Sequence, residues 1–236
     1  MTQQERSVRT RRAIVEAAGA IFAEKGFNGA TIADVYTRLG LTKGAFYYYF
    51  DSKEMLAQAV VDSQLYEDGN YPLVPRDSRL QELVDAGMVF AHRIRRDPMV
   101  QGGIRLSIEH GLDEACRRKP FAAWLDHDRQ ALVDAKAHGE LQPHVEPADV
   151  AMLFVGAFSG VQLLSEVMAG RVDLERRISI MLQYVMPSLA VPSILAKLDL
   201  GADRGARVLR ELEELADLER LDGARLPVGR QEAAAS

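Results

Sequence analysis

LGLTKGAFYYYFDSK, the stretch from Leu39 to Lys53, decides the fold of this chain. Gly40 follows an apolar run and can end a helix in the left-handed conformation that other residues avoid. Thr42 is of the residue type that caps a following helix, and Leu41 and Phe46 have the spacing of a hydrophobic staple around it. The stretch therefore predicts a tight turn and a short helix, as in the second half of a helix-turn-helix.

Two further helices are predicted before this stretch. Apolar residues recur with helical spacing from Ile14 to Phe22, and Gly26 is expected to end that helix. Thr31 begins the next helix, with Asp34 in the capping-box position. Three helices this short make a core too small to be stable alone, so a fourth helix over about residues 52–68 is expected to anchor them.

The charge of the chain is unevenly distributed. The net charge is −5 over 236 residues, which taken globally argues against nucleic-acid binding. Residues 1–53, however, hold eight Lys and Arg against five Asp and Glu, a net +3 that leaves −8 for the remainder. A basic head on an acidic body suits a protein that contacts phosphates at one end only.

The remaining residues predict a larger, all-α body, because no strand pattern competes anywhere. Residues 67–77 (EDGNYPLVPRD) are expected to be a linker, and the segment HGLDEACRRKP a loop or frayed helix end. Pro120 is expected to begin a helix that Gly139 ends, and another is expected to end before Pro187. The full set of expected body helices covers about residues 78–96, 98–110, 120–138, 147–169, 173–186 and 192–198, with a charged helix from 203 on and a disordered end, LPVGRQEAAAS.

The helix expected over residues 147–169 is the most apolar of the chain, and its apolar arc is too wide for one partner. We therefore expect it to lie between its own core and a second subunit, which predicts a homodimer. No run of about 18 or more apolar residues occurs, so no membrane span is expected. The N-terminus lacks the apolar core of a secretion signal, and the single cysteine, Cys116, fits a reducing cytoplasm.

The first 55 or so residues resemble the DNA-binding domain of the TetR family of transcriptional repressors, through TRRAIVEAAGAIFAEKGFNGATIADV and LGLTKGAFYYYFDSKEMLAQAV. The body resembles the γ-butyrolactone autoregulator receptors of Streptomyces, through LQELVDAGMVFAHRIR, GIRLSIEHG, PFAAW, GELQPHV, VGAFSGVQLLS and AVPSILAKLDLGADRGARVL. The resemblance implies an all-α homodimeric repressor of antibiotic-production genes that a γ-butyrolactone or butenolide releases from its operator. It divides the chain into a helix-turn-helix domain (1–53), a ligand-binding and dimerisation domain (54–202) and a charged C-terminal helix with a tail (203–236).

Seven residues of the head are predicted to contact double-stranded DNA. Most lie at helix N-termini, where amides and the helix dipole favour phosphate, and Lys43 can instead reach a guanine edge. The alternative is a purely structural role, in which this stretch is a helix cap with a few core aromatic residues. We expect Phe46 and Phe50 to be core residues. The predicted DNA contacts are Thr31, Thr42, Lys43, Gly44, Tyr47, Tyr48 and Lys53.

The ligand residues follow from the resemblance, because receptors of this type carry a tryptophan that lines the signal pocket. Trp124 is the only tryptophan here, and a flat indole can cover a lactone ring. Gln64 and Gln162 have largely apolar neighbours, so each either orients a lactone oxygen or makes a structural hydrogen bond. The full predicted set is Gln64, Met88, Phe90, Phe121, Trp124, Phe154, Phe158 and Gln162, some of which can equally be plain core.

An enzyme is not expected, nor is a cofactor or metal. The five histidines show no metal-ligand spacing with acidic partners, and Asp126, His127 and Asp128 are expected on a solvated helix face. Basic neighbours could lower the pKa of Cys116, but there is no second cysteine for redox chemistry. The alternatives to a signal-controlled repressor are a pseudo-receptor that answers antibiotics or biosynthetic intermediates, and a repressor of efflux or catabolic genes.

Overall fold

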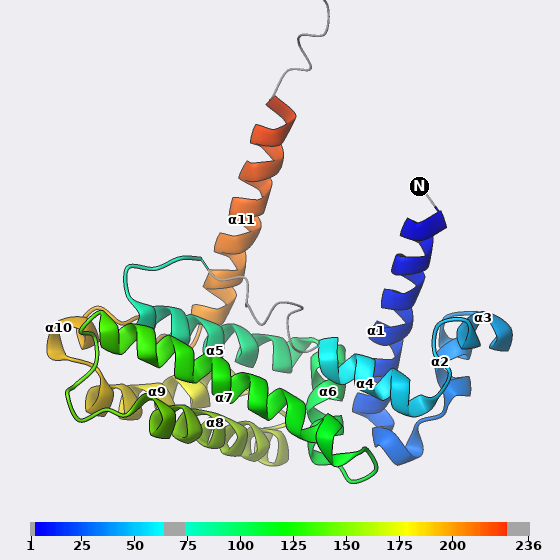
Figure 1. Cartoon of the computed structure of the whole chain (residues 1–236), viewed down its shortest axis with the longest axis horizontal. Helices are drawn as coiled ribbons and strands as arrows, with labels where there is room; N and C mark the ends of the chain where they lie inside the picture. Colours follow the sequence, from blue (N-terminus) through cyan, green and yellow to red (C-terminus); the bar gives the residue numbers. More distant parts are fainter. Residues whose placement is uncertain (1–2, 64–73, 226–236) are drawn as a thin grey trace, which may run out of the picture.

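The computed structural model describes residues 3–63 and 74–225, and every regular element in those ranges is a helix, so the expected all-α class is confirmed (Figure 1). The helices of the head are α1 (Gln3–Gly29), α2 (Ile32–Arg38), α3 (Lys43–Tyr47) and α4 (Lys53–Ser63). Those of the body are α5 (Arg79–Arg96), α6 (Pro98–Ile108), α7 (Glu114–Ala137), α8 (Pro147–Ala169), α9 (Leu174–Leu189), α10 (Pro192–Leu195) and α11 (Arg204–Arg225).

The head forms as its caps predict. Thr31 accepts a hydrogen bond from the Asp34 amide while the Asp34 carboxylate accepts one from the Thr31 amide, which is the expected capping box. Gly40 has a φ of 65°, as the turn requires. Gly26, with a φ of 69°, breaks α1 at the expected residue, and the helix then continues for a few residues to Gly29. These local signals set the end of α1 and the start of α2.

The head and the body join where α6 packs against both α1 and α4. Gly19 of α1 and Gly102 of α6 meet backbone to backbone, because a Cβ on Gly102 would collide with the Gly19 carbonyl oxygen. Leu106 of α6 is completely buried within the core of the head. The α4 residues Leu56 and Val60 lie in that same core, so α4 anchors the head as expected.

The body is built around α5, which lies among α7, α9 and α11 (Figure 1). Its N-terminus is capped from a distance: the buried carboxylate of Glu140 accepts hydrogen bonds from the amides of Arg79 and Leu80, both at 2.9 Å. On another face of α5, the fully buried Asp85 accepts two hydrogen bonds from Arg204 of α11, both at 2.7 Å, and one from Arg76. Long-range ionic contacts therefore position this helix.

Two expected helix boundaries in the body are wrong. α7 begins at Glu114 and not at Pro120, because the Asp113 side chain caps it at the Ala115 amide and the buried Pro120 is tolerated inside the helix. α9 continues past Pro187 to Leu189, whose side chain is buried and whose carbonyl accepts a 2.7 Å hydrogen bond from Gln142. Proline removes one backbone hydrogen bond from each helix, and neither helix ends there.

Helix α8 carries the wide apolar arc that the sequence predicts. Met152, Leu153, Leu163, Leu164, Val167 and Met168 are each at least half exposed, and Tyr184 of α9 is 82% exposed. By length and composition α8 is also the one described helix that could cross a membrane, with a mean hydropathy of 1.7 in its most apolar window. A single such helix is weak support for a span, since an interface helix of a water-soluble protein meets the same criteria.

Helix α11 packs its first turns on α5 and then projects away from the body (Figure 1). The chain beyond residue 225, with the predicted disordered end, lies outside the described residues, as do residues 64–73, which include Gln64 and most of the predicted linker.

Candidate functional site

Helix α3 and its two cap residues carry five of the predicted DNA contacts. The Thr42 hydroxyl caps it by accepting a hydrogen bond from the Ala45 amide at 3.2 Å. Lys43 is exposed, with its ammonium 5.9 Å from the centre of the Tyr47 ring. Tyr47 and Tyr48 are 39% and 78% exposed. An exposed cation and two exposed phenols therefore lie together at one short helix, which is a surface suited to phosphates and base edges.

The aromatic residues of this stretch divide as expected between surface and core. Phe46 and Phe50 are buried, at 0% and 2% exposed, and their rings contact each other at a centroid distance of 6.1 Å. Gly44 is exposed, and nothing lies within 4 Å of the position that a Cβ would occupy. Its lack of a side chain is therefore not required by the packing of this chain, and its predicted contact with DNA stays a prediction.

Thr31 and Lys53 have intramolecular partners. The Lys53 ammonium donates hydrogen bonds to the carbonyls of Phe27 and Ala30, at 2.7 and 3.0 Å, and lies 4.3 Å from the centre of the Phe27 ring. Lys53 thus ties α4 to the turn between α1 and α2, and a phosphate would have to share it with those carbonyls. The exposed Thr31 hydroxyl donates to Asp34 at 2.9 Å. Their predicted phosphate contacts remain predictions.

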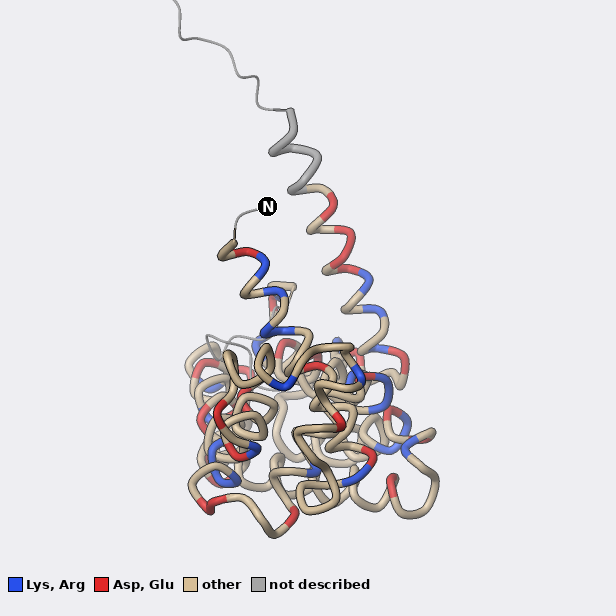
Figure 2. Tube along the Cα trace, turned by 90° about the vertical axis from the view of Figure 1, so that its right-hand side faces the viewer, with Lys and Arg blue, Asp and Glu red and all other residues tan. Residues whose placement is uncertain are grey.

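Two features make the head surface electrostatically distinct. Lys and Arg follow the projecting part of α1, as Figure 2 shows, while Asp34 at the start of α2 is neutralised by a 2.7 Å ion pair with Lys25. The hydrogen bonds from Lys25 and Thr31 lower the pKa of Asp34 to about 2. The carboxylate is therefore charged at any physiological pH and serves to fasten α2.

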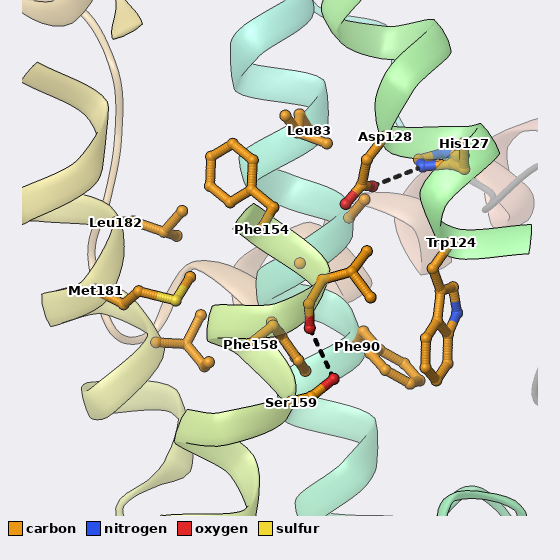
Figure 3. A pocket seen from close by; sticks show the side chains of 14 residues that line it. Leu83, Phe90, Trp124, His127, Asp128, Phe154, Phe158, Ser159, Met181 and Leu182 are labelled. Atoms are coloured by element: carbon orange, nitrogen blue, oxygen red, sulfur yellow. Dashed lines mark hydrogen bonds and ion pairs between the residues drawn. The ribbon is translucent and has the colours of Figure 1, made fainter. Parts of the chain in front are cut away.

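The body contains a cavity of about 80 Å³ between α5, α7, α8 and α9 (Figure 3). Its walls are mainly apolar and aromatic, with a few polar groups at the α7 and α8 sides. The lining residues are Leu83, Ala86, Gly87, Phe90, Trp124, His127, Asp128, Phe154, Val155, Phe158, Ser159, Ile178, Met181 and Leu182. An apolar cavity with few convergent polar groups is the usual form of a small-molecule site.

Three aromatic side chains from three helices form one wall of this cavity. The Phe90 ring lies 5.1 Å from the Trp124 ring and 5.6 Å from the Phe158 ring, centre to centre. These rings and Phe154 were all predicted to contact a ligand, and the structure brings them together at the cavity. The Phe90 and Phe158 rings are stacked and the Trp124 ring is tilted against Phe90, so the fold supplies an aromatic wall on which a ring-shaped ligand can pack.

Three other predicted ligand residues do not line the cavity. Met88 is completely buried in the core of the body, on the other side of α5, so its predicted role as lining is not supported. The Phe121 ring packs edge-on against the Trp124 ring, with their centres 5.5 Å apart, and is not among the lining residues. Gln162 is 6% exposed and its side-chain oxygen has no hydrogen-bond partner among the described residues. A buried acceptor without a partner is costly, which keeps Gln162 of interest one turn beyond Phe158 on α8.

Two polar cavity residues were missed because they were expected on a solvated face. His127 and Asp128 line the cavity, and the His127 Nδ1 atom lies 3.2 Å from the Asp128 carboxylate. The spacing of Asp128 four residues after Trp124, which places both on one helix face, was the signal that could have found it.

The expectation for Cys116 is also wrong: burial, Asp62 and Asp113 raise the pKa of its thiol, and Lys119 only partly offsets them.

Comparison with known proteins finds relatives for the head and for the body of this chain. Residues 14–60 match the family described as bacterial regulatory proteins, tetR family. The chain is 36% identical to the A-factor receptor protein of Streptomyces griseus, over 91% of this chain and 78% of that protein. It is 41% identical to TylP, a TetR regulator from Streptomyces fradiae whose crystal structure gives a TM-score of 0.79 over 88% of this chain and 99% of that one.

A further solved structure, which concerns the molecular basis for control of antibiotic production by bacterial hormones, is 32% identical and has a TM-score of 0.68. It covers 78% of this chain and 99% of its own. The family match covers the helix-turn-helix, and the full-length matches extend across the cavity-bearing body. This chain therefore belongs to the TetR family of bacterial regulatory proteins.

Proposed function

We propose that two copies of this chain bind a pseudo-palindromic operator and repress genes of secondary metabolism, antibiotic production included, until a γ-butyrolactone or butenolide signal releases them. One observation carries this proposal: an aromatic cavity walled by Trp124 lies in the body of a chain that is 36% identical, over 91% of its length, to the A-factor receptor protein. The protein acts in the cytoplasm, where its operator lies.

The head supplies the DNA contacts. Lys43, Tyr47 and Tyr48 project from α3, and the α3 amides can receive a phosphate, with Thr42 and Gly44 at the same helix start. In a dimer the two α3 helices enter successive major grooves about 34–36 Å apart. Because Lys and Arg neutralise phosphates, operator affinity falls steeply as salt concentration rises.

The exposed apolar surface of α8 and α9 supplies the dimer contact. Leu153, Leu164 and Met168 of α8 and Tyr184 of α9 are each more than half exposed. A monomer seldom leaves so large an apolar patch in water, so a second copy packed on it accounts for the composition of α8.

The cavity supplies the signal site. The Trp124 indole covers a lactone ring, and Phe90 and Phe158 pack on its alkyl chain. A cavity of about 80 Å³ holds only a few water-sized molecules, so a ligand with a chain displaces side chains and spreads the helices that line it. Gln162, one turn from Phe158, then gains the hydrogen-bond donor that its oxygen lacks.

Helix α7 connects the signal site to the head. Trp124 on α7 walls the cavity, and five residues earlier Lys119 pairs with Asp62 of α4 at 2.6 Å. A shift of α7 therefore moves α4 directly, while α6 holds α1 and α4 together. A preference of about 1–3 kcal/mol for the shifted state changes operator affinity severalfold to about a hundredfold.

The test is a footprint on the promoter of the protein's own gene, followed by titration of the complex with γ-butyrolactones and, separately, with antibiotics. Butyrolactones release the wild-type protein, whereas Trp124→Ala still binds the operator but no longer responds. Val133→Ala, an exposed position on the same helix, is the matched control and behaves as wild type. Release by antibiotics while every butyrolactone fails refutes the proposed signal, and the absence of any footprint refutes the repressor assignment.

A further inference from the structure

Asp128 is the one carboxylate among the fourteen residues that line the cavity. It lies one helical turn from Trp124 on α7, and both side chains point toward the cavity in Figure 3. The Asp128 side chain is 20% exposed, so most of its surface is withdrawn from water. A carboxylate held in mainly apolar surroundings needs hydrogen-bond donors, and it acts strongly on any charge that comes close.

The partners that the cavity offers Asp128 are few. His127 approaches it through Nδ1 at 3.2 Å, and no Lys or Arg is among the lining residues. The neighbouring Arg129 approaches Asp126, on the exposed side of α7. The Ser159 hydroxyl across the cavity donates to the Val155 carbonyl at 2.7 Å, so its proton is already engaged. The strongest acceptor facing the cavity is therefore the Asp128 carboxylate, and His127 is the one basic side chain of the lining that pairs with it.

We propose that Asp128, held by His127, is a specificity-determining residue of the signal site, which accepts a hydrogen bond from a ligand hydroxyl and excludes ligands that carry a carboxylate. The site thus takes the closed, neutral lactone and rejects the same molecule after water has opened its ring, because opening creates a carboxylate. This inference rests on the proposed function and goes beyond it, since it names the charge state of the ligand that the cavity distinguishes.

Charge repulsion sets the size of the effect. A ligand carboxylate brought beside Asp128 meets a like charge in a site partly shielded from water, which we expect to weaken binding by about 10- to 100-fold relative to the lactone. Asparagine at this position has nearly the same shape, removes the charge and can donate a hydrogen bond. Asp128→Asn is therefore expected to bind the opened acid more tightly and to lose most of the preference for the lactone.

The experiment measures dissociation constants on the full-length protein, using the fluorescence of Trp124, which is the only tryptophan of the chain. The probes are a synthetic γ-butyrolactone with a hexyl chain and a hydroxymethyl group, its base-opened sodium salt, and its O-methyl ether. Wild type is expected to bind the lactone at least about 10-fold more tightly than the salt or the ether. Asp126→Asn, whose side chain is 80% exposed on the same helix, is the matched control and keeps the wild-type ratios.

The possible outcomes distinguish a failure of the Asp128 assignment from a failure of the proposed function. The ratio of the affinity for the lactone to the affinity for the salt decides the role of Asp128. If this ratio is unchanged in Asp128→Asn, the role of Asp128 is overturned and the proposed function stands. Failure of wild type to bind any of the three probes, with the operator still bound, refutes the butyrolactone signal and with it this inference. A ratio that falls toward one in Asp128→Asn, and stays high in Asp126→Asn, supports the assignment.

Discussion

The contacts that hold the head differ from those that hold the body in how far apart the contacting residues lie in the sequence. In the head, α2 and α3 begin on their own caps, Thr31 and Thr42, each bonded to an amide three residues on. In the body, α5 has a local cap, Ser78, but it is also held by Glu140, 60 residues from Leu80, and by Arg204 of α11, 119 residues from Asp85. The short helices of the head therefore begin on local contacts, whereas α5 of the body depends also on charges that meet only in the folded chain.

The largest effect on stability is expected from a substitution that breaks the long-range contacts of the body. Asp85→Ala leaves Arg204 without its bidentate partner in a buried site, and breaking such a pair costs about 3–5 kcal/mol of unfolding free energy. Urea denaturation measures it. Asp203→Ala, whose side chain is 71% exposed where it pairs with Arg207, is the control and should lose less than about 1 kcal/mol. Equal losses in the two variants would mean that the body is not held by its buried charge.

The next effect concerns the join between the two regions. Gly102→Ala places a methyl group against the backbone of α1 at Gly19, which forces α6 and α1 apart and costs about 1–3 kcal/mol despite the better helix propensity of alanine. Thermal unfolding of the purified protein measures the loss. Gly29→Ala, where a Cβ meets only ordinary van der Waals contact, should leave the transition where it is. A stable Gly102→Ala protein would show that the two helices can separate freely.

The head is tested at its surface by Lys43→Ala. Loss of this exposed cation at the start of α3 should weaken operator binding by about 1–3 kcal/mol and, if Lys43 contacts a phosphate, reduce the salt dependence by about one ion. Fluorescence anisotropy at several salt concentrations measures both. Lys197→Ala removes an exposed cation from the body and should change neither quantity. Unchanged operator binding by Lys43→Ala would remove α3 from the DNA interface.

The smallest effect is a pH dependence in the head. The pKa of Asp34 is lowered to about 2 by its hydrogen bonds from Lys25 and Thr31, below its ordinary value near 4. A lowered carboxyl pKa stabilises the folded state above the ordinary value, and that contribution is lost as pH falls from about 4 to about 2. The stability of wild type relative to Asp34→Asn should therefore be constant above pH ~4 and fall below it. A difference that does not vary over this range would show that the Lys25 pair is not formed.

Much of the site was predictable wherever the signal is local. The turn at Gly40, the cap at Thr42 and the buried positions of Phe46 and Phe50 follow from neighbouring residues, and the structure agrees with each. Phe90, Trp124, Phe154 and Phe158 were also placed at the cavity, through the resemblance to receptors of known type. Met88 was misplaced because an apolar residue on a helix packed on several sides can face either the core or the cavity.

The polar side of the cavity could not be predicted from the sequence. His127 and Asp128 resemble a solvated charge run, and only the approach of α5, α8 and α9 turns them inward. The prolines at positions 120 and 187 likewise look like helix boundaries, but Asp113 caps α7 before the first and the Gln142 hydrogen bond holds α9 beyond the second. For the cavity residues and for α9 the deciding partner is distant in sequence, whereas Asp113 is a local cap that precedes the misleading proline.

The sequence by itself determined the all-α class, the helix-turn-helix and the family, because caps, turns and helical periodicity depend on residues within a few positions of one another. Only the tertiary structure decided which faces of α5 and α7 line the cavity and that Asp85 is clamped by Arg204. The physical reason is that burial and pairing of a charge depend on groups that are distant in sequence, and folding alone brings them together.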